Sequence, residues 1–504
     1  TRMENQKDNT LRIFILVVVG VIAGAVHFFG RVHVPEKVLV PSEAIPSVDL
    51  DSPRFYLDTL SGQLGPGYPC ETPEKVDDHV RSVILALSDL SPLVDMAERS
   101  SVLGAWDANE LAFYGAFLLE SSQMKELQEG KVPAPWLERA SGLAMGPSER
   151  EGILRLTLAK GEVTLFLRAD EEFLLISHSL EGLEKMRKAL DGSIERFRPL
   201  FTVEPTWPAH LAVFDGKLIA QAASLRGLAA PDKAITLELA WNSRPGSGEA
   251  AWKIEGLEEW LPTETRGKIT PMAWDGPAFL PEPLISAFGV SVPEGFGSLV
   301  EKELSIPEWM EEAGFDRASL AGLIEGPLVG VIGGQSRLLL FNLPGVILQL
   351  PSRGAEGVRW IRGLWDNKWA RFAFSPQPVT GFPAGGKLTL PFTIMAAANE
   401  EMAFAGLINE SSLGKMTPVE QVIPLSGEGS ILWFYADLPK AADALENLSR
   451  MAGLAERFGV DEAPDARELA RLVGQLRSLG QVTLVIHDLG SGRGGWKSTV
   501  PAAE

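Results

Sequence analysis

The sequence predicts an α+β protein in which an N-terminal transmembrane helix and a Pro-rich spacer precede two tandem copies of a mixed strand/helix unit. An uncharged apolar run at Ile13–Phe29 predicts the membrane helix. The segment GSGEAAWK at Gly246–Lys253 recurs as GSGRGGWK at Gly490–Lys497. Strand and helix patterns precede both segments in a similar order, which favours a duplicated unit.

These observations divide the chain into six parts. They are a cytoplasmic stub at 1–12, a transmembrane anchor or signal segment at 13–30, the spacer at 31–75, the first copy at 76–260, a linker at 261–279 and the second copy at 280–504.

Composition narrows the class of protein. A chain of 504 residues with 45% hydrophobic and 22% charged residues is long enough for more than one folded unit. Its formal charge of −20 repels phosphate backbones, so we expect no nucleic acid partner. Cys70 is the only cysteine, which excludes an intramolecular disulfide framework and a multi-cysteine metal site.

The apolar run reads IFILVVVGVIAGAVHFF and has about the minimum length for a membrane-crossing helix. Ala23-Gly24-Ala25 has the small-x-small form that a signal peptidase recognises, so cleavage after Ala25 is the alternative to a retained anchor. The run continues to Phe29, which favours the anchor. In both cases we expect the bulk of the chain to be extracytoplasmic, at the bacterial inner membrane, with the membrane contacted through this helix.

The spacer contains seven prolines between Pro35 and Pro73, which favour extended backbone over helix. Two apolar groups within it, Val38–Val40 and Phe55–Leu57, suit local pairing, so we expect part of the spacer to pack onto the unit that follows.

The first copy begins with a helical pattern and continues mainly with strand patterns. Ser179 is the expected N-cap of a helix that follows a strand. In order, the patterns predict a helix at 76–96, a short helical stretch leading into a strand over 101–119, a hairpin at 153–167 that turns at Lys160-Gly161, a strand and helix at 173–190, a strand at 211–214, a helix near 218–228 and a closing hairpin at 235–254.

The second copy repeats this order. The patterns predict a helical stretch leading into a strand over 318–334, strands at 337–350 and 387–395, a strand-to-helix step at 402–416, a strand at 431–435, a helix at 439–454 and a closing hairpin from 482 to 497. In both closing hairpins the glycines turn the chain, and we expect the tryptophan to pack against the sheet.

Few residues are arranged as a catalytic site. Ser412 and Lys415 have the S-x-x-K spacing of penicillin-recognising enzymes, but no K-T-G or S-D-N accompanies them, so Ser411 or Ser412 is better interpreted as a helix cap. The chain contains no G-x-S-x-G motif. The glycine-rich stretch at 326–334 lacks the lysine of a P-loop and precedes a strand, so we interpret it as a glycine-rich strand turn.

The histidines are scattered and none belongs to an H-E-x-x-H or H-x-H motif. They are His27, His33, His79, His178, His210 and His487. The sequence therefore predicts no catalytic residue, no cofactor and no metal site.

One stretch is locally basic and aromatic within an acidic protein. It reads GVRWIRGLWDNKWARF and contains Trp360, Trp365, Trp369, Arg359 and Arg362. At spacings of five and four, two of the three tryptophans fit one face of an amphipathic helix, which favours packing in a core. The alternative interpretation is a candidate interaction surface that faces a partner or a membrane.

The anchor at 13–29 and the strand-to-helix steps at 173–190 and 402–416 resemble those of bacterial single-pass anchored exported proteins of unknown function with repeated strand-rich ectodomains. The resemblance implies a location more than an activity.

The sequence thus predicts a non-enzymatic membrane-anchored extracytoplasmic protein, an envelope scaffold or binding module for a protein partner or a lipid-like apolar ligand. Apolar sheet faces that enclose a ligand favour lipid binding, and faces filled by their own side chains favour a scaffold. The alternative is an envelope hydrolase whose carboxylates converge only in the fold.

Overall fold

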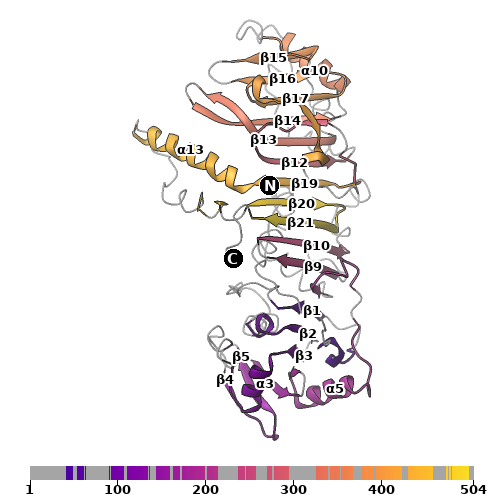
Figure 1. Cartoon of the computed structure of the whole chain (residues 1–504). Coiled ribbons are helices and arrows are strands. Elements are labelled where there is room, and N and C mark those ends of the chain that lie inside the picture. Colours follow the sequence, from indigo (N-terminus) through magenta and orange to yellow (C-terminus); the bar gives the residue numbers. More distant parts are fainter. Residues whose placement is uncertain are drawn as a thin grey trace, which may run out of the picture. The chain divides into compact units, whose positions relative to one another are not determined.

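Strands are the predominant secondary structure of the computed structural model, because many segments alternate between residues that face a core and residues that do not (Figure 1). The structure describes residues 41–48, 54–61, 63, 90, 92–106, 111–133, 136, 144–158, 163–170, 173–198, 201–213, 236–244, 246–256, 269–274, 277–293, 325–338, 341–351, 354–366, 377–389, 393–422, 429–457, 473–474, 476–477 and 480–498. The chain divides into two compact units, Thr1–Trp260 and Leu261–Glu504.

The first unit is built on an antiparallel sheet with the order β4-β5-β6-β7-β3-β2-β1-β8-β9-β10. Its strands are β1 (Arg54–Leu60), β2 (Arg99–Trp106), β3 (Leu111–Leu118), β4 (Ala144–Pro147), β5 (Leu154–Leu158), β6 (Val163–Ala169), β7 (Leu174–Ser177), β8 (Ala209–Val213), β9 (Thr236–Arg244) and β10 (Ser247–Glu255). Its helices are η1 (Pro41–Ala44), α3 (Ser121–Gln128) and α5 (Leu180–Leu190).

The second unit is built on an antiparallel sheet with the order β15-β16-β17-β14-β13-β12-β19-β20-β21. Its strands are β12 (Leu284–Val292), β13 (Gly326–Leu338), β14 (Phe341–Pro351), β15 (Ala384–Leu388), β16 (Ile394–Ala398), β17 (Met402–Leu407), β19 (Leu432–Asp437), β20 (Gln481–Ile486) and β21 (Ser491–Lys497). A separate small pair joins β11 (Pro277–Phe279) to β18 (Met416–Pro418). Its helices are α10 (Gly354–Asp366), η4 (Glu410–Ser412), α12 (Val419–Val422) and α13 (Leu438–Arg457).

The two sheets have the same strand order once the edge strand β4 is set aside. In chain order, β1, β2 and β3 correspond to β12, β13 and β14, the strands β5–β7 correspond to β15–β17, and β8, β9 and β10 correspond to β19, β20 and β21. Helices α3 and α10 both follow the third strand of this series. The segments Gly246–Lys253 and Gly490–Lys497 both run into the last strand of their unit, β10 and β21.

Both faces of the first sheet are covered by side chains of the same unit. On the face that packs against α3, Phe55 and Val102 join a core with Met124 and Leu127 of that helix and with Leu93. On the opposite face the core contains further apolar side chains from η1, the sheet and α5, namely Ala44, Ile45, Tyr56, Leu103, Tyr114, Leu183 and Met186. This unit therefore buries its sheet on two sides.

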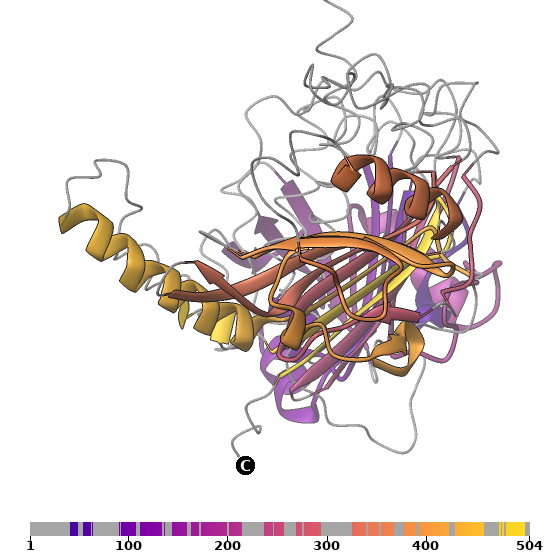
Figure 2. The ribbon, with the colours of Figure 1, turned by 90° about the horizontal axis from the view of Figure 1, so that it is seen from above.

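The second sheet is covered differently on its two faces. One face buries Trp433 and Val331 beneath the segment that contains Trp274 and Val419. On this face Gln349 is fully buried, and its side chain both accepts from Phe279 N (2.7 Å) and donates to Phe279 O (2.9 Å). On the other face helix α10 packs over β15, β16 and β17, as Figure 2 shows.

The predicted α+β fold class is wrong, and no N-terminal transmembrane helix is among the elements that the structure describes. The described chain is mostly antiparallel sheet with few helices, because the runs interpreted as mixed strand and helix form strand after strand. Residues 13–29 lie outside the described residues. Among the helices that the structure describes, none combines the length and apolar character needed to cross a membrane.

Individual elements were predicted with mixed success. The N-cap is confirmed, because the Ser179 side chain accepts a hydrogen bond from Gly182 N at 2.9 Å at the start of α5. The helix predicted at 439–454 is confirmed as part of α13. The helix expected after β17 is only the 3-10 turn η4, and the helical stretch expected near Ser101 is instead strand β2. The apolar group Phe55–Leu57, predicted within a spacer, lies in β1, which pairs with β2 and β8.

Candidate functional site

The predicted aromatic and basic surface falls on helix α10. Trp365 packs inward: its Nε1 donates to Ala396 O at 2.9 Å, and its ring lies over Gly386, where an added Cβ would be 2.6 Å from ring carbons. Trp360 is half-buried, whereas Arg359 and Arg362 are exposed. Trp369 lies outside the described residues. The structure thus explains Trp365 by packing of the amphipathic helix against the sheet.

The face that carries α10 also exposes large apolar side chains beside that helix. Phe288, Ile332, Val346, Leu348 and Leu407 are 41–48% exposed, and they are the large hydrophobic residues exposed in the described part of the chain. We call these five residues the apolar strip. They come from β12, β13, β14 and β17, which are neighbours in the sheet.

Strand register places the apolar strip on a single face. Val346 pairs with Ile332 on one side and with Leu407 on the other, so these three side chains form a row across the strands. Leu407 in turn pairs with Ile394 of β16, which extends the row.

A second row is formed by Phe288, Gly330 and Leu348. The Phe288 ring covers Gly330, where an added Cβ would lie 2.2 Å from a ring carbon.

This face is the one that α10 covers. Gly357 of α10 approaches Ala403 and Ala398, and Ala403 lies on the same side of β17 as Leu407 because side chains two residues apart share a face. Helix α10 therefore packs over β15–β17 and over Leu350 at the end of β14, and it leaves the five side chains of the apolar strip exposed.

The corresponding face of the first unit is closed. Phe55 lies over Gly104 there, as Phe288 lies over Gly330 in the second unit. Phe55 is nevertheless only 5% exposed, because Leu90, Leu93 and helix α3 pack against the same core. The same Phe–Gly arrangement is thus buried in one unit and open in the other.

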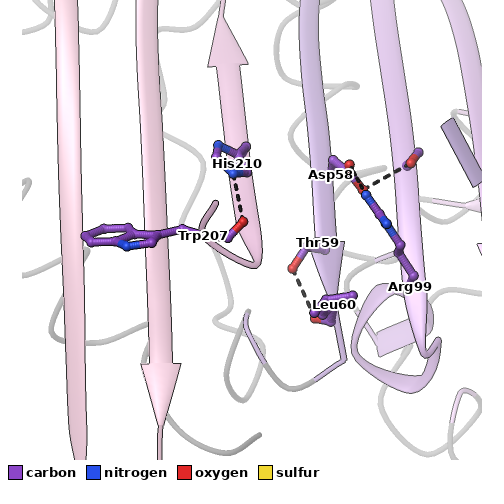
Figure 3. A network of polar contacts seen from close by, with 7 residues as sticks. Asp58, Thr59, Leu60, Arg99, Trp207 and His210 are labelled. Atoms are coloured by element: carbon purple, nitrogen blue, oxygen red, sulfur yellow. Dashed lines mark hydrogen bonds and ion pairs between the residues drawn. The ribbon is translucent and has the colours of Figure 1, made fainter. Parts of the chain in front are cut away.

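A polar cluster lies on the opposite face of the first sheet (Figure 3). Asp58 Oδ2 accepts from Arg99 Nη2 at 2.8 Å, and Asp58 Oδ1 accepts from Arg99 Nε and Ser101 Oγ, both at 3.2 Å. His210 lies opposite Asp58 in the ladder, but its Nε2 donates to Trp207 O at 2.9 Å. Burial lowers the pKa of His210, so the neutral ring is favoured.

This cluster does not form a nucleophile with an activating base. In a catalytic triad the histidine stands between the serine and the carboxylate. Here Asp58 stands between Ser101 and His210 in the strand register, and Ser101 donates to the carboxylate directly. Asp58, Arg99 and Ser101 therefore form a structural ion pair with hydrogen bonds across β1 and β2, whereas the buried Nδ1 of His210 has no hydrogen-bond partner among the residues that the structure describes.

The remaining sequence candidates do not converge on a reaction site. Ser412 ends η4, and Gly414, with φ of +72°, breaks the helix before Lys415, so the pair does not share one helical turn. The stretch at 326–334 lies in strand β13. His178 is held by the backbone of Phe113 and by its serine neighbours. In the part of the chain that the structure describes, no three His, Cys, Asp or Glu side chains are grouped to hold a metal ion.

Several carboxyl groups have a lowered pKa, whereas a general acid needs a raised one. Hydrogen bonds from Lys387 and from the Thr380 backbone lower the pKa of Glu410 to about 2. Hydrogen bonds also lower the pKa of Glu181, from Lys185, and of Asp191, from Ser193. A carboxyl that protonates a leaving group needs a raised pKa, so these three do not support the alternative hydrolase.

The apolar strip was not predicted from the sequence. Its residues alternate with buried ones along β14, where Val346 and Leu348 are exposed while Ile347 is buried. Because both sides of this strand carry apolar residues, the run GVILQL resembles a strand buried on two faces. Only the tertiary structure distinguishes the covered side from the open one.

Comparison with known proteins gives little similarity. No family model matches the chain. No curated protein matches it. Among solved structures, crystal form III of TP0453 is similar at 17% identity with a TM-score of 0.24, covering 44% of this chain and 80% of that chain. Crystal form IV of TP0453 is similar at 18% identity with a TM-score of 0.23, covering 43% and 81%. TM-scores this low carry no argument about fold or function.

Proposed function

We propose that the protein is a non-enzymatic binding module that holds an apolar partner against the apolar strip of its second unit. The observation that carries the proposal is the exposure of five large apolar side chains on neighbouring strands of one sheet face. Soluble surfaces seldom leave such side chains together without a binding role.

The contrast between the two units supports this proposal. In the first unit the same face buries Phe55, Val102 and Phe113 to 5% exposure or less. A sheet with this strand order can therefore be covered on this face by its own unit. The exposed face of the second unit is a difference between two otherwise similar sheets. The extracytoplasmic location predicted from residues 13–29 stays a prediction.

A neutral environment-sensitive dye tests the proposal on the full chain. We expect Nile red to bind with enhanced fluorescence, and the double variant Ile332→Thr, Leu348→Thr to weaken its binding at least tenfold. Threonine is β-branched and therefore suits a strand, and in both positions it removes apolar surface. Both residues are more than two-fifths exposed, so we expect the variant to fold normally.

The matched control is Gln335→Thr, which changes an exposed polar residue on the same strand as Ile332. It should bind Nile red as the wild type does. Equal binding by the wild type and the double variant would contradict the proposal.

A further inference from the structure

We infer that the ligand held by the apolar strip is a single extended acyl chain lying across strands β13, β14, β17 and β16. This inference rests on the proposed function and specifies its ligand class. It is carried by the area of the strip, by the row of side chains across it and by its lack of polar groups.

The area is too small for a stable protein partner. Five side chains exposed to 41–48% present on the order of 400 Å². A standard protein–protein interface buries about 800 Å² on each partner. A second copy of this chain docked on the strip alone would therefore bury about half of the area that a stable dimer needs, whereas one acyl chain has a surface of the right size.

The row geometry suits a linear ligand. Ile332, Val346, Leu407 and Ile394 occupy directly paired positions on four successive strands. Three strand spacings of about 4.8 Å give the row a length of roughly 14 Å. Beside it Ala405 is exposed and small, and Phe288 and Leu348 stand in the adjoining row. An extended hydrocarbon chain lying along the row would contact aliphatic side chains over its whole length.

The chemistry of the strip favours a ligand that needs few hydrogen bonds. The residues of the two rows are uncharged, Ser286 of β12, which pairs with Ile332 at one end, carries a hydroxyl, and the backbone groups of these strands pair within the ladder. A peptide segment laid on the strip would lose hydrogen bonds to water without gaining new ones, which is unfavourable. A methylene chain has no such groups, so its burial is favourable throughout.

A series of neutral monoglycerides tests whether the ligand is an acyl chain. Octanoyl, lauroyl and palmitoyl monoglycerides, each below its aggregation concentration, are used to displace Nile red from the full-length wild type. We expect affinity to rise by about twofold per added methylene, because an open strip covers only one side of the chain. The rise should level off once the chain spans the row.

Substitutions inside and outside the row distinguish an acyl chain bound along the row from nonspecific apolar contact with the protein. Val346→Thr replaces a methyl group by a hydroxyl within the row and should weaken lauroyl binding several-fold. Gln335→Thr, outside both rows, should leave it unchanged. Equal urea midpoints of the two variants and the wild type would show that folding does not cause the difference.

Three results would overturn the inference, and they have different consequences for the proposed function. If Nile red binding depends on the strip but no monoglyceride displaces it, the acyl chain is wrong and the binding module stands. If sedimentation shows a dimer that Ile332→Thr dissociates, the occupant is a second copy. If Nile red binds independently of the strip, both proposals fail.

Discussion

At the residue scale, the Asp58 ion pair stabilises the sheet of the first unit. Its carboxylate accepts three hydrogen bonds, two from Arg99 and one from Ser101, in a half-buried position between β1 and β2. We expect Asp58→Ala to lower the free energy of unfolding by about 1–3 kcal/mol, because the guanidinium and hydroxyl lose their acceptor. Urea denaturation measures this change.

The control for this prediction is Glu129→Ala, which breaks an exposed pair with Lys131. Exposed pairs contribute little, so its urea midpoint should stay at the wild-type value. A similar small effect for Asp58→Ala would show that the cluster does not stabilise the sheet.

Glu410 gives a pH dependence with a definite sign. Its pKa is lowered to about 2 by Lys387 and Thr380, so the charged carboxylate stabilises the folded state above its ordinary pKa of about 4.5. This stabilisation is lost as the pH falls from about 4.5 towards about 2. We expect Glu410→Gln to be less stable than the wild type at neutral pH and to lose less stability over that interval.

Urea midpoints measured at a series of pH values between neutrality and the acid limit check this prediction. Parallel pH profiles for the wild type and Glu410→Gln would rule out the assigned role.

Residue-level prediction from sequence succeeded where the determining contacts are local. The N-cap Ser179 bonds to a backbone amide three residues away, so sequence pattern alone identified it. Trp365 was placed correctly on an amphipathic helix, but its partners Gly386 and Ala396 lie more than 20 residues along the chain. The exposure of Leu348 depends entirely on what packs above it, which no local pattern records.

At the element scale, the two Phe–Gly pairs offer a matched test of the open and closed faces. A Cβ added to Gly104 would lie 2.1 Å from a carbon of the Phe55 ring, and a Cβ added to Gly330 would lie 2.2 Å from a carbon of the Phe288 ring. Phe55 is buried and cannot move freely, whereas Phe288 is 41% exposed and can swing into solvent. We expect Gly104→Ala to destabilise by about 1–3 kcal/mol and Gly330→Ala by less than about 1 kcal/mol.

Thermal or urea unfolding of the two variants compares them directly. Equal destabilisation would mean that the face of the second unit is as tightly packed as that of the first.

Individual strands were predicted better than the overall proportion of strand to helix. Strands at 153–167, 431–435 and 482–486 follow from alternation and β-branched content, and the structure contains β5–β6, β19 and β20 there. The prediction of the fold class failed because a short apolar run is compatible with either a strand or a buried helix. The segment 402–416 continues from β17 into η4 and β18, since Gly414 adopts a positive φ that ends the helical turn.

At the scale of the whole molecule, we propose that the two units are copies of one ancestral unit. Their sheets share one strand order from β1 to β10 and from β12 to β21, apart from β4. The proposal explains why the segments GSGEAAWK and GSGRGGWK both run into the last strand of their unit. If the units share an ancestor, the exposed face of the second unit is a local difference that arose after the duplication.

Net charge predicts how salt affects ligand binding. With a formal charge of −20, the chain repels anionic ligands over a distance that salt shortens. We expect the affinity for laurate to rise as sodium chloride is increased from low to physiological concentration, by more than the affinity for lauroyl monoglyceride. Displacement of Nile red at both salt concentrations measures the two ligands, and identical salt responses would contradict this prediction.

The central claim is that the face bearing the apolar strip is open and binds an apolar ligand, and thiol labelling tests it most directly. In a Cys70→Ser background, Leu348→Cys places a thiol on the strip, and Val102→Cys places one on the corresponding closed face, where Val102 is 1% exposed. We predict rapid labelling of Leu348→Cys, slow labelling of Val102→Cys and protection of the former by lauroyl monoglyceride. Labelling of Leu348→Cys as slow as that of Val102→Cys in ligand-free protein would contradict the account.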